Sequence, residues 1–193
     1  MCKYILQYQP SKKYSIEREK HLLVLMEKLR LNLVLKQKKD SSPIQVYHNR
    51  QFPLNDLLDI FYPLFHADYP DNFLIHMIRT ANHIFCAYDP SDRHPIACAL
   101  VNNTGRQGLY LMLFGVRKSS QHHGVGTKLL ERIIEWARFY QYTFIYLHVN
   151  AGNYKAIGLY KKLGFRQHEY LPNYYKDSPK ENPDGIRMIL SLQ

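Results

Sequence analysis

The chain contains few cysteines and no long apolar run. Its three cysteines, Cys2, Cys86 and Cys98, are spread over 193 residues. This number and spacing suit neither a disulfide framework nor a zinc site, which indicates a reducing compartment. No apolar run approaches the length of a membrane-spanning helix, and no signal-peptide pattern opens the sequence. We therefore expect an intracellular, cytoplasmic protein.

Acidic residues are also scarce. The chain has 16 Asp and Glu against 26 Lys and Arg, and its formal net charge is +10. Residues 1–43 hold ten of these cations and only four acids. Such a segment favours contact with RNA, a ribosome or an anionic membrane surface, although a solvated charged face explains it equally well. The location could then be peripheral to a membrane or a ribosome.

Hydrophobic periodicity predicts a basic helical leader followed by one domain. Residues 1–43 form the N-terminal extension, in which residues 15–39 have helical spacing. Residues 44–193 form an α/β (α+β) domain with a mixed central sheet of about seven strands and helices on both faces. The predicted strands are 44–52, 83–89, 95–103, 108–116, 142–149, 166–171 and 186–192, and the predicted helices are 53–65, 69–81, 125–140 and 153–164.

A glycine-containing loop, "SSQHHGVGTKLL", separates the strand at 108–116 from the helix at 125–140. Gly124 and Gly126 expose the main chain at the helix start, where unpaired N–H groups and the helix dipole bind phosphate. The loop lacks the Gly-Lys-Ser/Thr ending of a nucleotide P-loop and the three glycines of a dinucleotide motif. A pyrophosphate is therefore favoured over a triphosphate. The side chains that could add donors are Lys118, Gln121, His122 and His123.

Four segments together resemble the GNAT superfamily of N-acetyltransferases: "LYLMLFGV", "QHHGVGTKLL", "IYLHV" and "NYKAIGLYKKLGF". Two further segments, "YPDNF" at 69–73 and "QHEYLPNYY" at 167–175, are similar to the NatE- and NatF-type N-terminal protein acetyltransferases. The resemblance covers about residues 44–192. It implies acetyl-CoA as co-substrate and a splay between the fourth and fifth strands of the sheet.

The resemblance also implies roles for individual residues. In these relatives a tyrosine on the fourth strand and a histidine on the fifth help to remove the proton of the attacking amine; here these positions are Tyr110 and His148. Tyr160 matches the tyrosine that reaches the coenzyme sulfur, and Asn153 matches a contact to the pantetheine arm. Without the resemblance, a core aromatic and a buried imidazole would be the plainer interpretation of Tyr110 and His148.

The remaining contacts are implied in the same way. A backbone N–H near Leu113 or Phe114 would stabilise negative charge on the thioester oxygen. The full set of implied coenzyme contacts is Leu113, Phe114, Gly115, Val116, Gln121, His122, His123, Gly124, Val125, Gly126, Thr127, Asn153 and Tyr160. The implied peptide contacts come from the loops at 62–73 and 171–185 and from the fourth strand: Pro63, Tyr69, Met112, Tyr174 and Tyr175.

The function favoured by these residues is transfer of acetyl from acetyl-CoA to protein N-termini, on Met followed by a hydrophobic or amphipathic residue. An α-amino group, with a pKa of about 7.7–8.0, needs little help from a base. Acetylation of lysine or a small amine is an alternative, and a non-catalytic adaptor that binds acetyl-CoA or a nascent chain is another. No metal is predicted, because adjacent histidines such as His122 and His123 rarely converge on one ion. The partner is the N-terminal peptide of a protein, and the sequence does not determine the oligomeric state.

Overall fold

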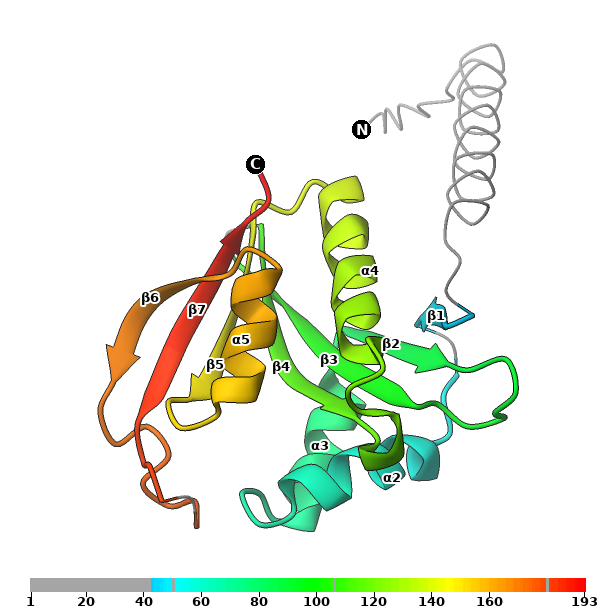
Figure 1. Ribbon diagram of the computed structural model, residues 1–193, viewed down its shortest axis with the longest axis horizontal. Coiled ribbons are helices and arrows are strands. Elements are labelled where there is room, and N and C mark those ends of the chain that lie inside the picture. The colour runs from blue at the N-terminus through cyan, green and yellow to red at the C-terminus, as the bar shows by residue number, and fades with distance from the viewer. Residues whose placement is uncertain (1–42, 50, 106, 180) are drawn as a thin grey trace, which may run out of the picture. The chain divides into compact units, whose positions relative to one another are not determined.

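The computed structural model describes residues 43–49, 51–105, 107–179 and 181–193. They form a seven-stranded mixed sheet in the order β1-β2-β3-β4-β5-β7-β6 (Figure 1). The strands are β1 (Gln45–His48), β2 (His83–Tyr88), β3 (Ala97–Thr104), β4 (Gly108–Val116), β5 (Phe144–Asn150), β6 (Arg166–Leu171) and β7 (Gly185–Ser191). This confirms the predicted fold class. The predicted leader, residues 1–43, lies outside the described residues except at its last position.

Helices cover both faces of the sheet (Figure 1). The helices are α2 (Leu54–Phe65), α3 (Asp71–Thr80), α4 (Val125–Phe139) and α5 (Tyr154–Lys162). Apolar residues of α2 and α3 pack with Leu100 and Leu113 in one core cluster. Residues of α4 and α5 pack with Leu109 and Leu111 in the other, larger cluster. None of these helices combines the length and hydropathy that crossing a bilayer requires.

The sheet opens between β4 and β5, its only parallel pair among the described strands. The two strands pair from Gly108↔Phe144 only as far as Leu111↔Leu147. At the same point the register of β4 with β3 shifts, because Leu100 pairs with Leu113 while Val101 pairs with Leu111, so that Met112 is an extra residue. Such a bulge bends its strand and ends regular pairing. The expected splay between the fourth and fifth strands is therefore present, and the bulge at Met112 accompanies it.

Most element boundaries lie within two residues of the sequence prediction, and the largest difference is the end of the first strand. The first strand ends at His48 instead of residue 52, because Asn49 turns into the left-handed region at φ 46°. Asparagine tolerates this conformation, and here its side-chain Oδ1 accepts a hydrogen bond from the N–H of Ile84 at 2.8 Å. Helix α2 runs through Pro63 and ends at Phe65, as predicted, whereas α3 begins at Asp71 instead of residue 69, so the loop between them covers residues 66–70. The turn after α5 is as predicted, with Gly164 at φ 92°.

Candidate active site

One cavity of about 160 Å³ lies where β4 and β5 part. Its lining residues come from both faces of the sheet and from two loops: Phe65, Asp68, Tyr69, Tyr110, Leu111, Met112, Leu113, Phe114, Leu147, His148, Val149, Asn150, Asn153, Ala156, Leu159, Tyr160, Tyr174 and Tyr175. Met112 belongs to the side of the sheet covered by α2 and α3. Phe114 belongs to the side covered by α4 and α5. The cavity therefore connects the two faces through the gap in the sheet.

Tyr110 and His148 meet on the α2/α3 side of this gap. They lie on neighbouring strands, and the His148 Nδ1 is 3.3 Å from the Tyr110 Oη. Tyr146 stacks on Tyr110 with ring centroids 4.7 Å apart, and Tyr174 stacks on His148 at 4.8 Å. The imidazole and phenol are thus held by aromatic neighbours at the centre of the cavity. The structure brings together the two residues that the sequence predicted as catalytic.

The surroundings favour the neutral form of both groups. Burial lowers the pKa of His148, the nearby Arg187 lowers it further, and Glu169 opposes this effect. Burial also raises the pKa of Tyr110 above its usual value, with a smaller contribution from Tyr174. At neutral pH, His148 is therefore a free base and Tyr110 is a protonated phenol. Of the two, His148 is the one able to accept a proton, while Tyr110 can donate a hydrogen bond.

The α4/α5 side of the cavity carries the residues expected to hold the coenzyme arm. Tyr160, on α5, is only 7% exposed, and burial raises its pKa. Its ring contacts Phe114 edge-on, with centroids 6.4 Å apart. Asn153 caps α5, its side chain accepting a hydrogen bond from the Ala156 N–H at 3.2 Å. Both residues line the cavity, so their expected contacts with a pantetheine arm are sterically available.

The loop before α4 has the backbone geometry of an anion-binding turn. A short 3₁₀ helix, Lys118–Ser120, is followed by His122 at φ 66° and by Gly124 at φ 78°. Gly124 is the N-cap of α4 and no side chain caps the helix there, so the first amides of α4 are available to a ligand. His122 and His123 are exposed beside them.

Three residues of this region that are expected to bind the coenzyme do not offer it a free side chain. The side chain of Gln121 donates to the Val116 carbonyl at 3.0 Å and so fastens the loop. Gly126 lies in a tight place, because an added Cβ would lie 3.3 Å from the Phe114 Cζ. The side chain of Val125 is buried in the core at 3% exposure. Gly126 and Val125 can therefore contribute only main-chain groups.

The other predicted residues of this set adjoin the loop. Gly115 packs against α2, where an added Cβ would be 2.9 Å from Leu64, so it too can offer only its main chain. Val116 packs on the larger core, and Thr127 is half-buried in the first turn of α4. Leu113 and Phe114 lie along the cavity beyond the last β4–β5 pair. Their role in stabilising an oxyanion stays a prediction.

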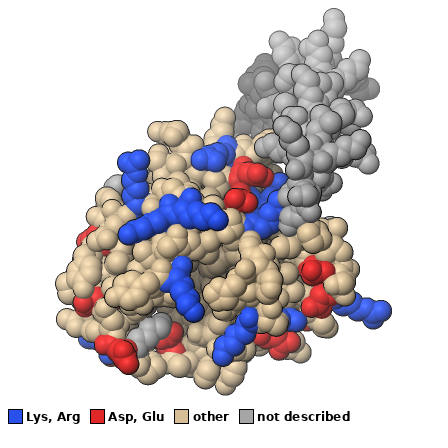
Figure 2. All heavy atoms as spheres, in the orientation of Figure 1, with Lys and Arg blue, Asp and Glu red and all other residues tan. Residues whose placement is uncertain are grey.

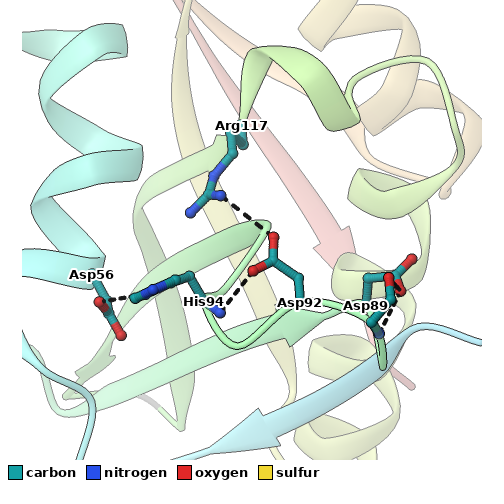
Figure 3. Close-up of polar contacts among 6 residues, drawn as sticks. Asp56, Asp89, Asp92, His94 and Arg117 are labelled. Atoms are coloured by element: carbon teal, nitrogen blue, oxygen red, sulfur yellow. Dashed lines mark hydrogen bonds and ion pairs between the residues drawn. The ribbon is translucent and has the colours of Figure 1, made fainter.

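A polar network anchors the start of the loop (Figure 3). Arg117 follows β4, its N–H donates to the Ile96 carbonyl at 2.8 Å, and its guanidinium lies 3.5 Å from the Asp92 carboxylate. Asp92 also accepts from the His94 N–H at 2.9 Å, and the His94 ring contacts Asp56 at 3.0 Å. The network thus joins the β2–β3 turn, the first turn of α2 and the loop entrance.

Basic residues predominate on α4 and α5. Lys and Arg side chains gather over these helices in the view of Figure 2. The two helices carry Lys128, Arg132, Arg138, Lys155, Lys161 and Lys162 against two acids, Glu131 and Glu135. Lys128, near the start of α4, adds positive charge beside the loop, whereas Arg138, Lys161 and Lys162 lie in the last turns of their helices. The described residues contain no group of three His, Cys, Asp or Glu side chains arranged for a metal ion.

The structure separates one predicted peptide residue from the site. Pro63 is exposed on α2 and lines a different groove, together with Tyr62 and Arg117. Pro63 does not line the cavity, whereas Phe65, two residues further along α2, does. The role of Pro63 in peptide binding stays a prediction. Tyr69, Met112, Tyr174 and Tyr175 do line the cavity. Three further residues that line the cavity were not predicted from the sequence: Phe65, Asp68 and Asn150. Asn150 could have been found, because it directly follows the predicted strand that carries His148.

An open sheet with a cavity through it and an uncapped helix start beyond it is an arrangement that suits an enzyme with two substrates, one on each face of the sheet. Residues 51–165 match the model of the acetyltransferase (GNAT) family. This match covers more than half of the chain, and the protein belongs to that family.

Known relatives include N-terminal acetyltransferases. The chain is 30% identical over 115 residues to a probable N-acetyltransferase, san, of Drosophila melanogaster, covering 58% of this chain and 62% of the relative. It is 33% identical over 82 residues to N-alpha-acetyltransferase 50 of Danio rerio, covering 42% and 49%. The matches thus span less than two thirds of either relative.

A solved structure confirms the fold. Arabidopsis thaliana Naa50 in complex with the bisubstrate analogue CoA-Ac-MVNAL superposes with a TM-score of 0.64 at 24% identity, covering 78% of this chain and 99% of that one.

Proposed function

We propose that this protein is an N-alpha-acetyltransferase, which transfers acetyl from acetyl-CoA to the free amino terminus of proteins. The observation that carries the proposal is the Tyr110–His148 pair, at 3.3 Å, in the cavity that joins the two faces of the sheet. The resemblance to N-alpha-acetyltransferase 50, and a bisubstrate analogue of CoA and a Met-initiated peptide bound to the Arabidopsis neighbour, support this acceptor class. The proposed preference is Met followed by a hydrophobic or amphipathic residue.

The residues of this chain fit the coenzyme. The uncapped amides of α4 suit a pyrophosphate, the basic side chain beside the loop suits its charge, and the α4/α5 side of the cavity suits an extended arm. Bound there, acetyl-CoA would supply the acetyl thioester. On the other side, His148 accepts the proton released by the amine, through the Tyr110 hydroxyl or a water. Tyr69, Tyr174 and Tyr175 enclose the amine and exclude bulk water.

The partners and location of the protein belong to this proposal as well. Residues 1–43 are predicted to bind RNA, a ribosome or an anionic membrane, and this prediction falls outside the described residues. A cytoplasmic location, which could be peripheral to a membrane or a ribosome, is proposed from the sequence features given above, among them the low cysteine content.

Acetylation of a peptide library tests the function. Peptides beginning Met-Leu and Met-Lys are compared with N-terminally blocked peptides that contain an internal lysine. We expect acetylation of the free α-amines, with kcat reduced about 10²-fold or more in His148→Ala and less in Tyr110→Phe, because proton transfer by a positioned group contributes about 10²–10⁴-fold.

Tyr142→Phe serves as the matched control, because Tyr142 donates to Asn103 away from the cavity. Faster acetylation of the blocked lysine peptides would replace the proposal by the lysine alternative. Coenzyme binding without acetylation of any amine would favour the adaptor.

A further inference from the structure

Two charged residues extend the row of side chains that begins at Tyr110 and His148. On β7, Arg187 is the residue paired directly with His148. On β6, Glu169 is paired with Arg187. Directly paired residues of neighbouring strands point to the same face of a sheet. Arg187 and Glu169 therefore lie on the face where His148 meets Tyr110, although neither lines the cavity.

The contacts of Arg187 contribute little to the stability of the folded protein. Its Nη1 lies 3.2 Å from the Glu169 Oε2, and the two side chains are 35% and 47% exposed. A half-exposed ion pair of this kind contributes little to folding. The Arg187 Nε is buried and has no hydrogen-bond partner among the described residues, which is unfavourable. Neither contact gives the guanidinium a clear structural purpose, so a role toward its neighbour His148 is a better explanation.

The other groups in contact with His148 are uncharged, and Asp68 is the one further acid among the residues that line the cavity. Tyr110 contacts its Nδ1, Tyr146 meets its ring edge-on at 5.9 Å, and Tyr174 stacks on it. Burial raises the pKa of Tyr110 and of Tyr174, so both are neutral phenols at physiological pH. The charges that act on His148 are those of Arg187, which lowers its pKa, and Glu169, which raises it.

On the basis of the proposed function, we propose that Arg187 and Glu169 are positioning residues for His148, whose opposed charges set how readily this imidazole accepts the proton of the substrate amine. The guanidinium disfavours the imidazolium form and keeps the base free. The carboxylate holds the guanidinium in place and limits its effect. The pair does not touch the reacting atoms.

Titration of His148 by NMR in the unliganded full-length protein tests this directly, with the signal assigned through His148→Ala. Arg187→Met should move the titration midpoint to higher pH, and Glu169→Gln should move it to lower pH. The double variant should return close to the wild type. In kinetics with a Met-Leu peptide, Arg187→Met should lower kcat/KM about threefold at pH 5.5 and less than twofold at pH 8.5, because imidazolium forms only at acidic pH.

The control is Arg132→Met, which breaks a comparable half-exposed ion pair, Arg132–Glu135 at 2.8 Å on α4, and should leave the midpoint unchanged. If Arg187→Met does not fold, the inference is tested by Glu169→Gln alone, in which the titration midpoint of His148 should move to lower pH. Unchanged midpoints, or shifts of the same sign in both single variants, would overturn the inference while wild-type acetylation leaves the proposed function intact. Loss of all acetylation in the wild type would overturn the function and, with it, the inference.

Discussion

At the scale of single residues, the backbone of the loop before α4 depends on one glycine. Gly124 has φ 78°, and no atom lies within 4 Å of the position where a Cβ would be. Crowding by neighbouring residues therefore does not require glycine there. The left-handed backbone conformation requires it. The same conformation aims the first amides of α4 at the surface next to the cavity. A side chain at this position would strain the turn and tilt those amides.

Gly124→Ala should weaken coenzyme binding and lower the melting temperature. A left-handed non-glycine residue costs about 1–2 kcal/mol, which corresponds to roughly 2–8 °C for a domain of this size. We expect the KM for acetyl-CoA to rise severalfold while the KM for the peptide changes little. Gly105→Ala is the control, because nothing lies within 4 Å of that position either and its φ is not in the left-handed region. Equal effects of the two substitutions would contradict this role of Gly124.

At the scale of elements, two loops distant in sequence form one wall of the cavity. The loop between α2 and α3 provides Asp68 and Tyr69, and the loop between β6 and β7 provides Tyr174 and Tyr175. The hydroxyl of Ser178 donates to the Asp68 carboxylate and so ties the loops together. Within the second loop, the Tyr175 N–H donates to the Pro183 carbonyl at 2.7 Å. The aromatic wall therefore depends on a contact between loops as well as on each loop.

Ser178→Ala should impair peptide binding more than catalysis. Without the hydroxyl, the β6–β7 loop loses a link to Asp68 and the tyrosines become less well positioned. We expect the KM for a Met-Leu peptide to rise about threefold to tenfold, as loss of about 1 kcal/mol would produce, with kcat and the KM for acetyl-CoA within twofold. Thr80→Ala, which removes a hydroxyl hydrogen bond of 2.8 Å to the His76 carbonyl at the end of α3, outside the cavity lining, should change none of these constants. An equal rise in that control would refute the loop contact as the cause.

At the scale of the whole molecule, the sheet is incomplete where the coenzyme arm would lie. Pairing of β4 with β5 ends at Leu111↔Leu147, and the two core clusters approach each other at this gap. A ligand that fills the gap would contact β4, β5, α5 and the loop before α4. It would bind only the folded state and would therefore stabilise it.

Coenzyme A should raise the melting temperature of the full-length protein. At about 100 times its dissociation constant, a ligand adds about 2.7 kcal/mol, or roughly 5–10 °C for a domain of this size. The measurement is thermal denaturation with coenzyme A and, as the control, with ATP at the same concentration. ATP carries phosphates and adenine but no pantetheine arm for the gap, so its effect should be smaller. Equal stabilisation by both would show that charge alone is recognised.

Much of the domain was predictable because its information is local. Alternating and helical apolar periods indicated the helices and strands of residues 44–193, and Gly164 marked the end of α5. Gly124, at the junction of a strand and a helix, indicated the anion-binding turn. The roles of Tyr110 and His148 required the family resemblance, because isolated aromatic and imidazole residues occur in many cores.

The sequence by itself determined the elements, their order and the glycine turn before α4, since these depend on neighbouring residues. Only the tertiary structure decided which distant residues meet. The bulge at Met112 places both Met112 and Leu113 on the α2/α3 side, which strict alternation does not predict. Packing at the end of α2 brought Phe65 but not Pro63 to the cavity, and the β5–β7 register placed Arg187 beside His148. Register between strands separated by dozens of residues is fixed by packing of the whole sheet, and no local pattern encodes it.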